Sequence, residues 1–275
     1  MKKTMKKVLS LAMASAMILA LGACSNSNSE KTDLEMVKEN GKLKVGFTYY
    51  EPMNYKDENG EFVGFETEFA KAVSEKIGVE AEFVEISWDA KITELQSKNV
   101  DCLWNGMTIT PEIAEALSVS DPYIKNFQVV VIRSENANEY KSTADLAGKT
   151  VAAEAGSAGE ATMKGETPDE NLAKAECLSV GKQTDALMEI KAGGVDAGVM
   201  DFVLADALVG KNDYADLMMI PDLQLSVEEY GVGFRKDSDL VAEVNKAMQE
   251  MVKDGSLAEL AEKYGLGSQL ISNQK

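Results

Sequence analysis

Histidine is absent from this chain of 275 residues, and arginine occurs only twice, at Arg133 and Arg235. Because histidine is the commonest general base and the commonest metal ligand, its absence excludes Ser–His and Cys–His catalytic arrangements within the chain. The three cysteines, Cys24, Cys102 and Cys177, lie far apart and form no CxxC pair. Zinc sites are built from closely spaced Cys and His ligands, so we expect no metal site.

Positive charge is scarce as well. The chain has 28 lysines and arginines against 46 aspartates and glutamates, a formal net charge of −18. The first 24 residues hold four lysines and no acidic residue, so the remainder carries −22. Such a surface repels nucleic acid and attracts cations, although acidity also keeps an exported protein soluble. The hydrophobic content of 45% is sufficient for the core of one large domain or two small ones.

Residues 1–23 have the pattern of a secretory signal peptide, in which basic residues precede a short apolar run. That run, Val8–Ala20, is too short to span a bilayer comfortably. It is followed by Leu21-Gly22-Ala23-Cys24, which resembles the lipobox of bacterial lipoproteins. This resemblance implies cleavage before Cys24 and a diacylglyceryl group on its sulfur. A soluble export signal with an incidental cysteine is the alternative. We expect residues 24–36 to be a lipidated, flexible tether.

Strand and helix patterns alternate from residue 43 onward. A strand at 43–47 precedes a helix over 65–77, a strand at 81–86, a helix around 88–95 and a strand at 100–104. The pattern starts afresh near residue 146, where residues 146–152 enter a strand and the turn at 156–159 leads into a helix. A short strand at 177–180, a helix over 184–191 and a strand at 195–200 follow. This order predicts parallel pairing with right-handed crossovers. Two further apolar helices follow residue 240.

The segment Asp101–Tyr123 is the most informative part of the chain. An apolar strand breaks at Asn105-Gly106 and is followed by hydroxyl side chains at Thr108 and Thr110, just before a helix start at Pro111-Glu112. Ligands of open α/β sheets bind where strands end in such turns. We therefore expect a binding site here.

The runs Gly106-Met107-Thr108-Ile109-Thr110-Pro111-Glu112 and Ser120-Asp121-Pro122-Tyr123 resemble those of the bacterial extracellular solute-binding proteins that deliver polar amino acids to ABC importers. The resemblance extends from about Leu43 to Gly265. It implies a type II periplasmic-binding-protein-like fold of class α/β: two Rossmann-like lobes with mixed, mostly parallel sheets, joined by a two-strand hinge, with a ligand cleft between them. Lobe 1 would comprise residues 37–130 and 230–275, and lobe 2 residues 131–229, with crossings at 128–133 and 229–235.

The resemblance also implies that Asp201 pairs with the ligand's ammonium, although Asp201 could instead cap a helix. The turn at Gly156, Ser157 and Ala158 could hold a carboxylate with backbone N–H groups or be a plain glycine turn. The family has an aromatic residue over the ligand, which is Tyr49 or, by preference, Tyr50. Trp88 and Trp104 could face the ligand or belong to the core. The full set of expected ligand-binding residues is Tyr50, Trp88, Trp104, Asn105, Gly106, Met107, Thr108, Ile113, Gly156, Ser157, Ala158 and Asp201.

One position departs from the family. After Thr-Pro-Glu the family usually carries an arginine that binds the ligand's α-carboxylate, and this chain has Ile113. Either backbone N–H groups and Thr108 hold the carboxylate, or the solute is a cationic amine, such as a polyamine or methylated amine, without one. We expect an amino acid as the solute, with a cationic amine as the alternative.

The expected function is therefore that of a lipid-anchored, monomeric solute-binding protein on the outer face of the cytoplasmic membrane. Its partners would be a small solute, the ABC permease and the membrane, with no nucleic acid, no cofactor and no catalytic residue. A lyase on the same fold is a second hypothesis, since fold does not settle function. A sensor or adhesin that uses the same fold is a third.

Overall fold

The computed structural model describes residues 31–165 and 168–274, and Thr32 onward forms a single unit. The expected signal peptide and the lipidation site Cys24 lie outside the described residues. Among the described helices, none has the length and apolar character needed to cross a bilayer.

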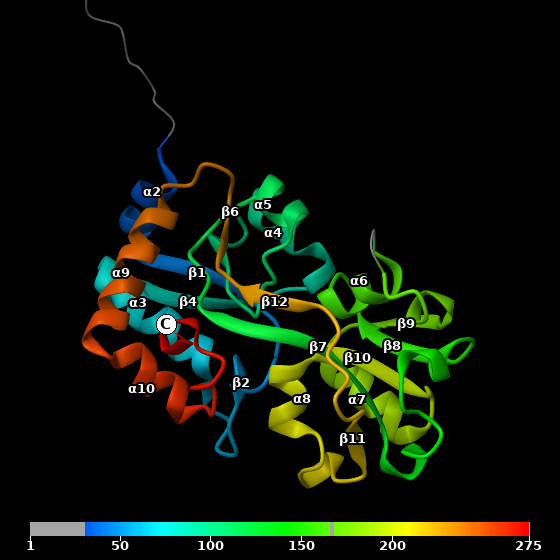
Figure 1. Cartoon of the computed structure of the whole chain (residues 1–275). Helices are drawn as coiled ribbons and strands as arrows, with labels where there is room; N and C mark the ends of the chain where they lie inside the picture. The colour runs from blue at the N-terminus through cyan, green and yellow to red at the C-terminus, as the bar shows by residue number, and fades with distance from the viewer. Residues whose placement is uncertain (1–30, 166–167, 275) are drawn as a thin grey trace, which may run out of the picture. The chain divides into compact units, whose positions relative to one another are not determined.

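Two large sheets organise the described chain (Figure 1). The first has the strand order β4-β1-β5-β13-β6. Its parallel pairings join β1 to β4 and β5, and its antiparallel pairings join β13 to β5 and β6. The strands are β1 (Lys42–Phe47), β4 (Glu80–Glu85), β5 (Cys102–Leu103), β6 (Ser118–Val119) and β13 (Gly233–Phe234).

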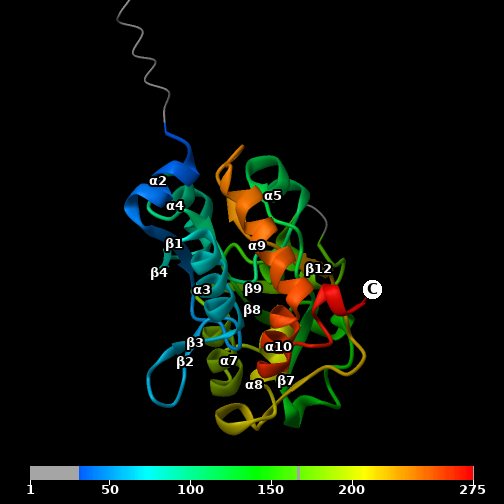
Figure 2. The same ribbon diagram turned by 90° about the vertical axis from the view of Figure 1, so that its left-hand side faces the viewer.

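Helices α3 (Phe65–Ile77), α9 (Leu240–Asp254) and α10 (Ser256–Lys263) pack together beside the first sheet (Figure 2). The predicted helix over 65–77 is confirmed. Phe65, Phe69 and Val73 recur on one face and are fully buried, and Gly78 ends the helix in the left-handed conformation. The remaining helices of this part are α2 (Asp33–Asn40), α4 (Lys91–Gln96), which follows a 3-10 turn at Trp88–Ala90, and α5 (Pro111–Ala116).

The second sheet has the order β11-β7-β10-β8-β9. It too is mixed, because β8 pairs in parallel with β9 and β10, whereas β7 pairs antiparallel with β10 and β11. Its elements are β7 (Ile124–Arg133), β8 (Thr150–Glu154), α6 (Ala158–Lys164), β9 (Glu176–Val180), α7 (Gln183–Ala192), β10 (Ala197–Asp201), α8 (Phe202–Leu208) and β11 (Leu217–Met219).

Two antiparallel segments connect the two sheets. Strand β12 (Val227–Tyr230) pairs with the first half of β7, while the second half of β7 belongs to the second sheet (Figure 1). Two crossings were predicted, but their bounds differ. The first begins at Ile124, and the single strand predicted over 229–235 is divided into β12 and β13, the latter within the first sheet.

The prediction of a flexible tether over 24–36 is wrong for its last residues, because α2 begins at Asp33. Thr32 caps this helix in a capping box with Glu35. The helix is held to the rest of the fold by Asp33, whose carboxylate accepts from Arg235 at 3.0 Å, and by the Leu34 N–H, which donates to Asp239 at 2.9 Å. Arg235 therefore has a structural role outside the crossings.

Candidate ligand-binding site

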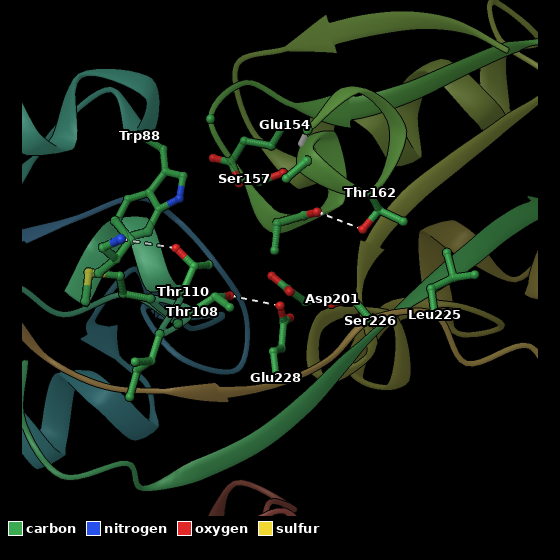
Figure 3. Close-up of a pocket in the computed structure, with 18 of the residues that line it drawn as sticks. Trp88, Thr108, Thr110, Glu154, Ser157, Thr162, Asp201, Leu225, Ser226 and Glu228 are labelled. Carbon is green, nitrogen blue, oxygen red and sulfur yellow. Dashed lines mark hydrogen bonds between the residues drawn. The ribbon is translucent and has the colours of Figure 1, made fainter. Parts of the chain in front are cut away.

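A cavity of about 1160 Å³ lies between residues of the two sheets (Figure 3). Its lining includes all but one of the residues expected to bind ligand, namely Tyr50, Trp88, Asn105, Gly106, Met107, Thr108, Ile113, Gly156, Ser157, Ala158 and Asp201. These residues come from segments more than 150 positions apart in sequence. The fold thus brings into one cavity the residues that were expected to bind ligand because they follow the ends of separate strands.

Trp104 is the exception, and the expectation that it faces the ligand is not supported. Its side chain is fully buried in the core and packs edge-on against Phe69 with ring centroids 5.0 Å apart. The next residue, Asn105, lines the cavity. Successive side chains of an extended segment point to opposite sides, so Trp104 lies on the core side of the segment.

Tyr50, and not Tyr49, lines the cavity. The Tyr50 hydroxyl lies 2.9 Å from that of Tyr230 on β12, so a hydrogen bond joins the loop after β1 to a crossing strand. Gly106 adopts φ +56°, and a Cβ there would lie 2.5 Å from Cε1 of Tyr50. Glycine is therefore required both for the backbone conformation and for the close approach of the tyrosine ring.

Asn105 lines the cavity, but its amide is used within the protein. Its Oδ1 accepts from the N–H and the hydroxyl of Thr48, and its Nδ2 donates to the Thr48 carbonyl. These bonds fix the loop after β5 against the end of β1. The side chain thus positions the turn at Gly106.

Glu66 supports the same turn from below and was not predicted. It is fully buried on α3, and its carboxylate accepts from the Gly106 N–H at 2.9 Å, from Asn54 at 3.0 Å and from the hydroxyl of Tyr123. Burial raises the pKa of Glu66 to about 7, and the hydrogen bonds oppose that shift. The helix that forms the core thus also holds the floor of the cavity.

Asp201 lies at the end of β10 with its carboxylate held by amides. Asn126 donates to its Oδ1 at 2.8 Å, Gln128 donates to the same oxygen at 2.6 Å, and Gln183 donates to Oδ2. Asp201 is the N-cap residue of α8, but its side chain makes no capping bond; Asn126 accepts from Val203 N–H instead. The carboxylate is thus oriented by neighbours and faces the cavity.

Glu228 on β12 lies beside Asp201 and shares its amide donors. Asn126 and Gln128 both donate to Glu228 Oε1, the latter at 2.6 Å, while Thr108 donates to Oε2 at 3.0 Å (Figure 3). Burial and the charge of Asp201 raise the pKa of Glu228 to about 8. Two adjacent carboxylates therefore face the same cavity.

A third buried carboxylate, Glu154, ends β8 and also lines the cavity. Burial, followed by the charge of Asp201, raises the pKa of Glu154 to about 8. Neither Glu154 nor Glu228 was predicted. Glu154 ends a predicted strand, so the rule that placed Asp201 could have found it. Glu228 depends on the pairing of the crossings, which the sequence does not reveal. No cluster of ligands suited to a metal occurs among the described residues.

The turn at Gly156–Ala158 is largely occupied by the protein's own groups. The Gly156 N–H donates to Glu160 at 2.9 Å, and the Ser157 N–H donates to the Glu154 carbonyl at 3.1 Å. The Ser157 hydroxyl caps α6 by accepting from the Glu160 N–H at 3.1 Å. These contacts favour the plain glycine turn over a backbone cradle for a carboxylate.

The Trp88 side chain lies across the cavity from Asp201 (Figure 3), and the apolar side chain of Ile113 also lines the cavity. Lys91 supplies the one cationic side chain among the described lining residues, and its Nζ donates to the carbonyl oxygens of Gly156 and Trp88 at 2.8 and 3.2 Å. Desolvation lowers the pKa of Lys91. Neither arginine of the chain lines the cavity among the described residues.

Arg133 does not line the cavity of the described structure, because its side chain is bonded to the backbone within the fold. Its guanidinium donates to the carbonyls of Ile190 and Val195 at 2.7 and 3.0 Å, which ties β7 to the end of α7. Lys182, which follows β9 of the second sheet, and Glu85, which ends β4 of the first sheet, form an ion pair at 2.7 Å. The Cα of Asp89 lies 2.8 Å from the position of a Cβ added at Gly156, so the two walls approach closely here.

Several known proteins are similar to this chain in sequence and in fold. A family model described as bacterial extracellular solute-binding proteins, family 3, matches residues 43–267. The chain is 34% identical over 266 residues to the arginine-binding extracellular protein ArtP of Bacillus subtilis (strain 168), covering 96% of this chain and 99% of ArtP.

Two solved structures show the same fold. A mutant of ArgBP from T. maritima has a TM-score of 0.77 and 35% identity, covering 84% of this chain and 98% of that one. The ancestral amino-acid-binding protein AncCDT-1, described as a precursor of cyclohexadienyl dehydratase, has a TM-score of 0.75 and 33% identity, with the same coverage of 84% and 98%. The α/β fold with two lobes and a cleft is that of these amino-acid-binding proteins, and the chain belongs to the bacterial extracellular solute-binding proteins, family 3.

Proposed function

We propose that this protein captures a small amino-acid-type solute outside the cell and delivers it to the permease of an ABC importer. The observation that carries this proposal is the Asp201 carboxylate, which lines the cavity and is held in place by three side-chain amides. Such an oriented carboxylate is suited to bind the ammonium of a ligand. The amino-acid-binding relatives support the same solute class.

Capture would proceed by hinge closure, with β7 and β12 as the flexible connections. The lobes would be residues 37–130 with 230–275 and residues 131–229, and α2 would join the first. Tyr50 would cover the ligand, with Thr108 and the Gly106 turn beneath it. The Lys182–Glu85 pair would form only when the lobes approach.

We further propose that Cys24 carries the lipid that anchors the mature, monomeric protein to the outer face of the cytoplasmic membrane. The support is the sequence Leu21-Gly22-Ala23-Cys24 after a signal-peptide pattern. Two acyl chains hold a protein on a membrane far better than one. Replacing Cys24 with alanine is expected to release the protein into the soluble fraction, and unchanged membrane association would refute the anchor.

Binding without catalysis is the proposed role. The chain lacks histidine, and the Glu228 carboxylate accepts hydrogen bonds from the Gln128 amide and the Thr108 hydroxyl, an arrangement that suits cation binding. A lyase remains the competing activity, because one structural neighbour is described as the precursor of a dehydratase. Turnover of an amino acid or a prephenate-like acid by the purified protein would establish it.

A cationic amine without an α-carboxylate is the second candidate solute. Two observations favour it: Ile113 stands where the family has an arginine, and the Gly156 and Ser157 N–H groups, which could otherwise hold a carboxylate, are already used within the protein. An unpaired carboxylate in such a partly desolvated place is unfavourable.

A thermal-shift screen of the standard amino acids, polyamines and methylated amines tests the proposal. A ligand at one hundred times its dissociation constant stabilises the folded state by about 2.7 kcal/mol. We expect at least one amino-bearing solute to raise the melting temperature, and Asp201→Asn to abolish the shift. Absence of any shift across the screen would contradict the proposed function.

A further inference from the structure

The side chain of Glu154 has a feature that the proposed ammonium site at Asp201 does not explain. It is only 4% exposed, lines the cavity, and its Oε1 has no hydrogen-bond partner among the described residues. Buried polar atoms in folded proteins are nearly always hydrogen-bonded, because an unsatisfied carboxylate oxygen loses its solvation without compensation. An orphaned acceptor that faces a cavity fits a donor supplied by a ligand.

The neighbouring groups do not supply that donor. The charges that act on Glu154 are those of Asp201 from β10, Asp185 from α7 and Lys91 from α4. Lys91 is the cation among these three, but its ammonium donates to the backbone carbonyls of Trp88 and Gly156. Gln183, the remaining polar neighbour, donates its amide to Asp201, and a side-chain hydrogen bond from Gln183 also lowers the pKa of Glu154, yet Oε1 of Glu154 still lacks a partner in the described structure. Negative charge therefore prevails around Glu154.

Glu154 is also separate from the pair formed by Asp201 and Glu228. That pair is joined by shared donors, since Asn126 and Gln128 each donate to both carboxylates. Glu154 comes from a different strand, β8, and accepts from neither of these donors in the described structure; its link to Asp201 runs through Gln183, which donates to Asp201 and also hydrogen-bonds to Glu154. The cavity thus offers two centres of negative charge on the side of the second sheet.

We propose that Glu154 forms a second cation subsite, so that the cleft selects solutes with two separated positively charged nitrogen groups. One group binds at Asp201 and Glu228, and the other at Glu154. The lining residues support such a ligand, because five of them are acidic (Glu112, Glu154, Asp169, Asp201 and Glu228) and one is cationic, Lys91. This inference rests on the proposed binding function and specifies its substrate class.

Titration calorimetry in mildly alkaline buffer tests the subsite with four probes: 1,4-diaminobutane, arginine, butylamine and glutamine. The diamine and arginine each carry two cationic groups, without and with a carboxylate respectively, and are called dications here. Butylamine and glutamine each carry one cationic group and are called monocations. We expect at least one dication to bind about tenfold or more tightly than both monocations, a difference of about 1.4 kcal/mol. The tighter binder of the two dications shows whether the preferred solute is a diamine or a basic amino acid.

Glu154→Gln should weaken dication binding by about thirtyfold or more, as expected when one partner of a desolvated charge pair is lost. It should change butylamine binding much less. Glu176→Gln is the matched control, because Glu176 is an exposed residue on the adjacent strand β9 that does not line the cavity. Glu154→Asp keeps the charge and should retain part of the dication preference. Circular dichroism and melting temperature report whether each variant folds.

Equal binding of dications by the wild type and a folded Glu154→Gln would overturn the subsite. So would tighter binding of glutamine than of either dication, an outcome that would leave the proposed amino-acid-binding function intact. If none of the probes and no solute of the wider screen binds, the proposed function itself fails. The two failures are therefore distinguishable.

Discussion

The two walls of the cleft differ in chemistry more than in architecture. Both arise where strands of mixed α/β sheets end, yet the second-sheet side carries Glu154 and Asp201, and the first-sheet side carries Trp88 and Ile113. A wall of buried carboxylates selects for charge, whereas an apolar wall selects for shape. In this cleft, the ligand's positive groups would bind to one lobe and its carbon skeleton would pack against the other.

The walls also differ in how their polar groups are satisfied. On the first-sheet side, Asn105 and Glu66 have their hydrogen bonds completed by protein groups and hold a turn in place. On the second-sheet side, Glu154 has an oxygen that still lacks a partner. A hydrogen-bond network that is complete within the protein keeps the site rigid. A network with an unpaired acceptor can gain a hydrogen bond from a ligand.

Asp201→Asn, in the acidic wall, is expected to cause the largest loss of ligand affinity. The substitution keeps the shape but removes the charge that pairs with the ligand's ammonium. Losing one partner of a desolvated charge pair costs about 2–5 kcal/mol, which is roughly thirtyfold to several-thousandfold in affinity. Calorimetry with whichever solute the screen identifies measures it. Binding that stays within a few-fold of the wild type would show that Asp201 does not contact the ligand.

Gly106→Ala tests the rigid floor on the other wall. Alanine at φ +56° is strained, and its Cβ would meet the Tyr50 ring at 2.5 Å. We expect a loss of stability of about 1–3 kcal/mol together with weaker binding, because the turn and the ring both line the cavity. Gly41→Ala is the control, since Gly41 also has a positive φ but a Cβ there meets nothing within 4 Å. Equal losses in the two variants would attribute the effect to backbone conformation alone.

Ile113→Arg would make the apolar wall resemble the family pattern. Arginine can bind a carboxylate with two parallel hydrogen bonds, and hydrogen bonds to charged groups contribute about 1.5–3 kcal/mol. The variant should therefore bind a standard amino acid about tenfold or more tightly and a simple amine more weakly. Affinities that remain unchanged for both solute classes would mean that residue 113 does not face the ligand.

Much of this architecture could be predicted from local patterns. Helix α3 was predicted at its observed bounds because its apolar period and Gly78 agree. The start of α2 was missed, although Thr32 and Glu35 form a capping box that is visible in the sequence. Site residues that follow strands, such as Thr108 and Asp201, were expected for a physical reason, namely that strand ends converge at one edge of a sheet.

The rest of the site depends on information that the sequence pattern lacks. Trp104 was misplaced because the alternation of a strand does not say which face meets the core. Glu228 lies on β12, and its position beside Asp201 follows from the antiparallel pairing of two segments about 100 residues apart. Glu66 lies in a helix whose pattern indicates only an amphipathic surface, and its burial became evident from the packing of α3 beneath the Gly106 turn.

The buried carboxylates in and beneath the cleft should make both stability and ligand affinity depend on pH, in opposite senses. Glu66, Glu154 and Glu228 have pKa values raised to about 7, 8 and 8, so the unliganded fold favours their protonated forms. That stabilisation is fully present below the ordinary carboxyl pKa and is lost as pH rises through 7–8. The unliganded protein should therefore melt at a lower temperature at alkaline pH than at mildly acidic pH.

Cation binding favours the ionised carboxylates, so affinity should increase with pH over the same range. The change is at most about tenfold, or 1.4 kcal/mol, per pH unit for each proton released. Calorimetry in buffers of different ionisation enthalpy counts those protons directly. Glu154→Gln and Glu228→Gln should each reduce the number released. A proton count of zero between pH 6 and 8 would contradict the assignment of raised pKa values to the ligand-facing carboxylates.

The smallest effect is expected for the ion pair of Lys182 and Glu85, a 2.7 Å contact between the ends of strands from the two sheets. Both side chains are partly solvated, with 33% and 46% exposure, so water and salt screen their attraction. Exposed ion pairs typically contribute about 0.2–1 kcal/mol. Glu85→Gln should therefore weaken ligand binding by no more than about fivefold, chiefly through faster dissociation, because the pair would stabilise the closed form and not the empty one. The effect should fade at high salt, whereas the loss caused by Asp201→Asn should persist because that carboxylate is buried. Stopped-flow measurement of ligand dissociation at two salt concentrations distinguishes the two variants. If the loss of affinity in Glu85→Gln does not depend on salt, then the Lys182–Glu85 pair does not act through its charge.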